Sequence, residues 1–158
     1  MNKTNAMRIL DSHKIKYGVF SYEYKDNKID GVEVAKKIGK DPIQVYKTLV
    51  TQGISKEIYV FVIPVEKELD LKKAAIIAGE KKIDMIAVKD INKYTGYIRG
   101  GCSPIGQKKK YKTFIDESAS EIDYIIVSGG KIGLQIEILV SDLLLIVEGS
   151  LEDLTKNV

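Results

Sequence analysis

Residue types that could do chemistry are concentrated in a few short segments of this 158-residue chain. The first is the run VYKTLV at 45–50, in which Lys47 and Thr48 interrupt apolar residues. A cation and a hydroxyl in such a strand are expected to face a concave pocket from which water is partly excluded. Alternatively, the segment is an edge strand whose lysine extends to water.

The second segment is the glycine-rich run TGYIRGGCSPIG at 95–106. Several glycines around one proline indicate a loop of fixed shape that exposes backbone amides at close range, although an ordinary long turn would fit the pattern too. The third segment, VSGG at 127–130, combines the hydroxyl of Ser128 with two glycines, whose backbone no side chain shields. On its own it is more typical of a hairpin.

The common catalytic templates are absent. His13 and Cys102 are the single histidine and the single cysteine, which excludes a Ser-His-Asp triad, a multi-cysteine metal site and an internal disulfide. Neither of the usual phosphate-binding glycine motifs is present. Without a histidine to activate it, Cys102 is not expected to act as a nucleophile. An enzyme with this sequence is expected to work without metal or cofactor.

Charge gives a weaker indication of function. The 25 basic and 22 acidic residues leave a net charge of +3, which is too small to indicate nucleic acid by itself. Isolated lysine pairs are typical of solvated helix faces. The denser cluster Lys108–Lys110, with Lys112 beside it, follows the glycine-rich run and is a candidate for contact with phosphate.

The elements that must position these segments follow from periodicity. The pattern predicts strands over 17–24, 45–52, 57–65, 85–88, 113–116, 124–128 and 134–139, and helices over 5–14, 31–38, 69–78, 141–146 and 151–155. Glycines separate the members of two strand pairs, which predicts two hairpins and favours a partly antiparallel sheet. We therefore expect one α+β domain over 1–158 with a mixed, largely antiparallel sheet flanked by helices.

The sequence also suggests where the protein resides. The apolar stretch 136–147 is interrupted by Glu137, Ser141 and Asp142, too soon to span a bilayer. The first ten residues lack the apolar block of a secretory signal. We expect a cytoplasmic protein with no membrane partner.

Five separated blocks then point to one family. VYKTLV, PVEKELDLKK, TGYIRGGCSPIGQKKK, IDESA and VSGGKIGLQIE occur in that order, and in this the chain resembles the YbaK proteins, free-standing relatives of the editing domain inserted in bacterial prolyl-tRNA synthetases. The resemblance covers about residues 6–154. It implies a single domain with a partly open, barrel-like sheet.

The resemblance also implies a function. It implies deacylation of Cys-tRNA, chiefly the mischarged Cys-tRNA(Pro) but also Cys-tRNA(Cys), in partnership with prolyl-tRNA synthetase and through the acceptor end of the tRNA. The alternatives are a deacylase for another small amino acid, such as Ala-tRNA(Pro), that uses a bound water, and a binding module that docks tRNA ends without chemistry.

The family's site residues transfer by position. The expected catalytic residues are Lys47, Gly100 and Gly101, and the expected substrate-binding residues are Tyr22, Thr48, Cys102, Ser103, Pro104, Ser128 and Gly129. Gly100 and Pro104 match the ends of the family's GxxxP loop. Two positions depart: Asp30 stands where some members have an aromatic residue, and Gln135 where some have aspartate.

The implied mechanism uses the substrate's own thiol, which attacks the ester carbonyl and releases a cyclic thiolactone. Amides of residues 100–103 would then contact the carbonyl oxygen. Lys47 would hold either the terminal phosphate or ribose of the tRNA or the developing oxyanion, and the sequence leaves these roles open.

Overall fold

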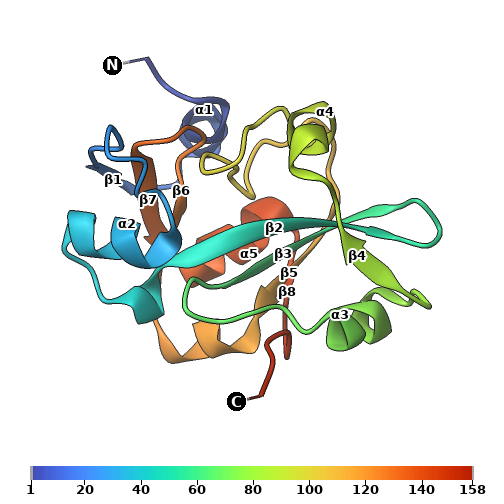
Figure 1. Ribbon diagram of the computed structural model, residues 1–158. Coiled ribbons are helices and arrows are strands. Elements are labelled where there is room, and N and C mark those ends of the chain that lie inside the picture. The colour runs from blue at the N-terminus through green and yellow to red at the C-terminus, as the bar shows by residue number, and fades with distance from the viewer. Residues whose placement is uncertain (1, 158) are drawn as a thin grey trace.

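The computed structural model describes residues 2–157 and is built on two sheets (Figure 1). The first has the strand order β1-β7-β6 and the second β4-β2-β3-β5-β8. The strands are β1 (Gly18–Ser21), β2 (Tyr46–Gly53), β3 (Ile58–Pro64), β4 (Ile83–Met85), β5 (Lys112–Asp116), β6 (Tyr124–Ser128), β7 (Leu134–Leu139) and β8 (Ser150–Glu152). Neither sheet closes into a barrel.

Both predicted hairpins are present, and they give each sheet its antiparallel part. β2 pairs with β3, and β6 pairs with β7. In contrast, β5 lies parallel to both β3 and β8, which makes the five-stranded sheet mixed. A single parallel bridge between Val45 and Ile126 connects the start of β2 to β6, so the two sheets meet at this point.

Five α-helices surround the sheets, and several have clear sequence signals at their ends. They are α1 (Asn5–Ser12), α2 (Gly31–Ile38), α3 (Leu71–Ala78), α4 (Ile91–Thr95) and α5 (Val140–Val147), with short 3-10 helices at Pro42–Gln44, Val88–Asp90 and Glu117–Glu121. The side chain of Asp30 caps α2 by accepting a hydrogen bond from the amide of Glu33. Gly39 ends the same helix in the left-handed conformation.

The core lies on both faces of the five-stranded sheet, which explains why every residue of β3 is buried. Val60 and Val62 contribute to a large cluster that includes residues of α1 and α5. Tyr59, Phe61 and Ile63 contribute to the opposite cluster, which α3 covers. Figure 1 shows α3 and α5 on either side of this sheet. A strand covered on both faces reads as a continuous apolar run rather than an alternating one.

These findings confirm the expected α+β class and mixed sheet with flanking helices, with three differences. The strand expected over 85–88 is displaced toward the N-terminus: β4 covers Ile83–Met85, and a 3-10 helix begins at Val88. The strands form two sheets rather than one. The helix expected over 151–155 is wrong, because this segment is extended: β8 pairs with β5, and Thr155 bridges to Leu69. The extended chain lets Leu154 become fully buried, which a short exposed helix would not. Within residues 2–157, no helix is long and apolar enough to cross a membrane.

Asp116 fixes this C-terminal segment and gives a test of the fold. Its buried carboxylate accepts hydrogen bonds from the amides of Leu154 (3.0 Å) and Ser118 (3.1 Å). Asp116→Ala leaves both donors unpaired and should lower the free energy of unfolding in urea by about 2 to 4 kcal/mol. Asp153→Ala, which removes an exposed carboxylate, should cost less than about 1 kcal/mol. Equal effects of the two variants would contradict this role for Asp116.

Candidate active site

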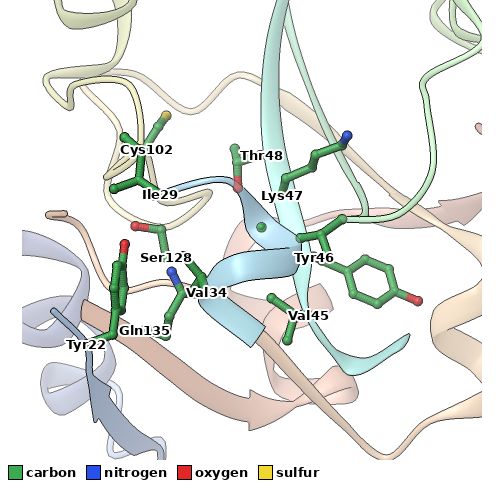
Figure 2. Close-up of a pocket in the computed structure, with 13 residues that line it drawn as sticks. Tyr22, Ile29, Val34, Val45, Tyr46, Lys47, Thr48, Cys102, Ser128 and Gln135 are labelled. Carbon is green, nitrogen blue, oxygen red and sulfur yellow. The ribbon is translucent and has the colours of Figure 1, made fainter. Parts of the chain in front are cut away.

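A small cavity lies where the two sheets meet, beside the start of β2 (Figure 2). Its volume is about 110 Å³, less than the roughly 150 Å³ of an engineered cavity that holds benzene. Only a small chemical group therefore fits inside. The wall consists of Tyr22, Ile29, Gly31, Val34, Val45, Tyr46, Lys47, Thr48, Val65, Gly100, Cys102, Ser128 and Gln135.

Lys47 supplies a half-buried positive charge to this wall. Among residues 2–157 no side chain or carbonyl lies within hydrogen-bonding or ion-pair distance of its Nζ. Burial lowers the pKa of the Lys47 ammonium below its usual 10.5, and the charge of Glu68 partly opposes this effect. An ammonium without a partner and with incomplete hydration favours an anionic ligand.

Two hydroxyls in the wall also lack partners. The Tyr22 Oη and Thr48 Oγ1 atoms are buried, and neither forms a hydrogen bond within the described part of the chain. Gln135 is 6% exposed, and its side-chain amide has no hydrogen-bond partner among the same residues. Leaving buried polar groups unpaired destabilises a fold, so their collection in one cavity indicates a site for a polar ligand.

The glycine-rich loop forms another part of the wall through Gly100 and Cys102. Gly100 has a φ of 84°, a conformation that glycine adopts readily. Across the described residues, the amides of Gly100, Cys102 and Ser103 donate no hydrogen bond, whereas the amide of Gly101 donates to the Ile98 carbonyl at 3.0 Å. The loop therefore offers free donors for a developing negative charge, but the Gly101 amide is already paired.

The structure brings together six of the expected site residues and leaves four outside the cavity wall. Those in the wall are Lys47, Thr48, Tyr22, Gly100, Cys102 and Ser128, and those outside it are Gly101, Ser103, Pro104 and Gly129. The four residues outside the wall shape the loops instead. Ser103 is buried and its Oγ accepts from the amide of Ile105. A Cβ on Gly101 would lie 2.8 Å from backbone atoms of Lys131 and Ile132.

Several wall residues were not expected from the sequence, and most are apolar. Ile29, Gly31, Val34, Val45, Tyr46 and Val65 complete the cavity. Asp30, which matched an aromatic position of the family, is the cap of α2, and its neighbour Ile29 faces the cavity instead. The aspartate before the helical run 31–38 was a capping signal that could have revealed this. Gln135, noted as a departure, lies in the wall.

Neither Cys102 nor His13 has the surroundings of a catalytic group. Burial raises the pKa of the Cys102 thiol to about 11, so the thiol stays protonated near neutral pH. His13 ends α1 outside the cavity wall, and its Nδ1 lies 2.9 Å from the Ile9 carbonyl oxygen. Within residues 2–157 no group of three or more His, Cys, Asp or Glu residues could hold a metal ion.

The lysine cluster lies beside another, larger cavity of about 580 Å³. Lys109 and Lys110 line this larger cavity, and neither borders the small one. Lys110 pairs with Glu148 at 2.6 Å, and the Lys108 Nζ donates to the Lys93 carbonyl at 3.2 Å. Two of the four lysines thus have partners, and the cluster's contact with phosphate stays a prediction.

Comparisons with known proteins agree on one family. Residues 28–145 match the sequence model of the aminoacyl-tRNA editing domain. The chain is 42% identical over 153 residues to an Enterococcus faecalis protein named "Putative Cys-tRNA(Pro)/Cys-tRNA(Cys) deacylase EbsC", covering 97% of this chain and 93% of that protein.

Solved structures share the fold at lower identity. One, described as "Crystal structure of a putative trans-editing enzyme for prolyl tRNA synthetase", has a TM-score of 0.84 at 21% identity and covers 99% of this chain and 100% of its own. Another, "hypothetical protein APE2540", has a TM-score of 0.87 at 17% identity, covering 96% and 99%.

The tight contact at Gly101 gives a test of the loop. Because the added methyl group of Gly101→Ala would meet backbone at 2.8 Å, the loop must shift. We expect the variant to lose about 1 to 3 kcal/mol of stability in thermal or urea unfolding. Gly18→Ala is the matched control, since its Cβ would meet only the Glu137 Cβ, at 3.8 Å. Wild-type stability for Gly101→Ala would contradict the packing described here.

Proposed function

Because the chain belongs to the aminoacyl-tRNA editing domain family, we propose that it deacylates Cys-tRNA(Pro), and also Cys-tRNA(Cys), in the cavity beside β2. The observation that carries this proposal is a cavity of about 110 Å³ that combines an unpaired lysine, unpaired hydroxyls and free loop amides. These groups bind and polarise an ester, but none of them is an activated nucleophile. The proposal covers residues 1–158 as one editing unit.

The reaction needs little from the protein because an aminoacyl ester is already activated. The substrate thiol attacks its own carbonyl carbon to form the carbon–sulfur bond, and the ester carbon–oxygen bond breaks. The tRNA ribose oxygen leaves with the proton that the thiol gives up, and the aminoacyl part leaves as a cyclic thiolactone. Holding the thiol and carbonyl together in a small cavity favours this ring closure.

The developing oxyanion would be stabilised by fixed dipoles and charge. We assign this role to the free amides of Gly100 and Cys102, the two residues of the loop that border the cavity. Lys47 lies on strand β2, opposite Tyr22 and Ser128 in Figure 2. It supplies a positive charge either to the same oxyanion or to the terminal phosphate of the tRNA. Loss of an oxyanion contact lowers kcat, whereas loss of a phosphate contact raises mainly KM.

The proposed partners are the acceptor end of the tRNA and prolyl-tRNA synthetase. The cavity is too small for more than the aminoacyl group, so the tRNA body must lie on the surface around it. One structural neighbour is described as "a putative trans-editing enzyme for prolyl tRNA synthetase". By analogy, we propose that the synthetase releases the mischarged tRNA that this protein then deacylates.

A second candidate has the same fold and site. The unpaired hydroxyls of Tyr22 and Thr48 could orient a water molecule in place of the substrate thiol. Such an enzyme would act on Ala-tRNA(Pro), whose side chain also fits the cavity. The two candidates differ in the group that attacks the ester.

Substitution of Lys47 tests the proposed site. Lys47→Ala should slow deacylation of Cys-tRNA(Pro) by roughly a hundredfold or more, the scale of one oriented electrostatic contact. Lys81→Ala, an exposed lysine outside the cavity wall, should have wild-type activity. A folded Lys47→Ala variant with nearly full activity would remove Lys47 from the mechanism.

The lowered pKa of Lys47 adds a pH signature to the same test. A cation that stabilises charge is effective below its pKa, so activity should fall as pH rises, beginning below pH 10.5. Lys47→Arg, which keeps its proton at these pH values, should remove this alkaline loss of activity after subtraction of spontaneous ester hydrolysis.

The attacking group can be identified by changing the substrate. Serine is nearly isosteric with cysteine, but its hydroxyl stays protonated where a thiol is partly ionised. We expect Ser-tRNA(Pro) to bind and to react roughly a hundredfold or more slowly than Cys-tRNA(Pro), with thiolactone forming before free cysteine. Comparable rates, with free amino acid as the first product, would favour the water-using candidate.

A further inference from the structure

The wall of the cavity itself contains charge of one sign only. Of the residues in its wall, Lys47 is the single one with a charged side chain at neutral pH, and no carboxylate is among them. Three neutral polar side chains lie together on the other side of the cavity: Tyr22, Ser128 and Gln135 (Figure 2). Ser128 and Gln135 are paired across β6 and β7, and Tyr22 follows the end of β1, so one sheet holds all three.

The carboxylates just outside the wall each have a hydrogen-bond or ion-pair partner of their own. Asp30 accepts the α2 capping hydrogen bond at 3.1 Å, and Glu137 pairs with Lys40 at 3.4 Å. Glu68 pairs with Lys156 at 3.1 Å, and its negative charge raises the pKa of Lys47. Another cation, the Lys37 Nζ, lies 5.9 Å from the centre of the Tyr22 ring and pairs with Asp26 at 2.9 Å.

Two other titratable groups of the wall, the thiol of Cys102 and the phenol of Tyr46, are neutral near pH 7. Burial raises the pKa of the Cys102 thiol to about 11 and also raises the pKa of Tyr46. A ligand in this cavity therefore meets one positive charge and otherwise neutral dipoles.

An aminoacyl ester brings its own α-amino group into this environment. As an ammonium, that group would find no carboxylate in the wall to pair with, and the one charge of the wall, on Lys47, is also positive. Both desolvation and a like charge disfavour the ammonium relative to the free amine. The free amine needs only neutral partners, and the side-chain amide of Gln135 and the hydroxyls of Tyr22 and Ser128 meet that need.

We propose that this cavity selects the substrate in its free-amine form, with Gln135, Tyr22 and Ser128 receiving the uncharged α-amino group. The inference rests on the proposed deacylase function and adds the protonation state of the substrate. It makes Gln135 a specificity-determining residue: a carboxylate at this position would create the missing partner for an ammonium.

A binding experiment on the wild-type protein tests the inference without chemistry. The first probe is a tRNA(Pro) acceptor minihelix carrying serine through a stable 3′-amide. The second is the same minihelix carrying 3-hydroxypropionyl, which lacks the amino group. Between pH 6 and 9, the Kd of the seryl probe should rise about tenfold for each pH unit below the pKa of its amine. The Kd of the deaminated probe should change less than about threefold, and at pH 9 the two should agree within about tenfold.

The variant Gln135→Glu tests whether residue 135 lies next to the α-amino group. Its added carboxylate should reverse the trend, so that the seryl probe binds more tightly below the amine pKa than above it. Circular dichroism and thermal unfolding establish whether the variant folds. If it does not fold, the pH dependence of Kd for the wild-type protein decides the inference.

The outcomes separate this inference from the proposed function. Wild-type binding of the seryl probe that is independent of pH, or tighter at pH 6 than at pH 9, overturns the free-amine inference while the deacylase proposal stands. If neither probe binds more tightly than the minihelix with a bare 3′-hydroxyl, both proposals are overturned.

Discussion

The start of strand β2 is the part of the structure on which the rest depends. At Val45 the chain bridges to β6 and joins the two sheets, and within the next residues it pairs with β3. Lys47 and Thr48 follow directly, before the strand enters the core. The backbone hydrogen bonds of two sheets therefore hold a lysine and a hydroxyl in a partly dry cavity, where neither finds a partner among residues 2–157. The unpaired polar groups lower the stability of the folded state, and the rest of the fold offsets this loss.

This arrangement explains how an enzyme can lack the usual catalytic side chains. The wall has a protonated thiol and no histidine or carboxylate. What it provides is confinement, fixed charge and free amides, which stabilise a transition state without forming a covalent bond to it. The nucleophile must then come from the substrate or from water, and the small volume limits which side chains enter.

The sequence predicted the elements well where a local signal existed. The hairpins at 45–65 and 124–139 and the helix over 31–38 follow from strand-like and helical periodicity and from the glycines between the strands. The segment 151–155 looked like a short helix, because the pattern does not show that Asp116, far away in the chain, holds Leu154 in an extended conformation. For the same reason the division into two sheets could not be predicted, since it depends on which strands pair.

The candidate site was predicted in part. The resemblance gave Lys47, Thr48 and Gly100, which lie within its sequence blocks, and also Tyr22, which lies outside them; all four border the cavity. Motif positions alone do not tell which residues of a loop face the cavity, so Gly101, Ser103 and Pro104 were expected there but pack outside its wall. The apolar wall, with Ile29 and Val65, comes from segments that meet only in the folded chain.

The account's central claim is that this cavity removes cysteine from tRNA, and a comparison of substrates tests it most directly. The wild-type protein is incubated separately with Cys-, Ala- and Pro-charged tRNA(Pro), and the loss of each ester is followed against buffer. The account predicts rapid loss of the cysteinyl ester, slower loss of the alanyl ester and no loss of the prolyl ester beyond the spontaneous rate. A cysteinyl ester that persists as long with the protein as in buffer alone would contradict it.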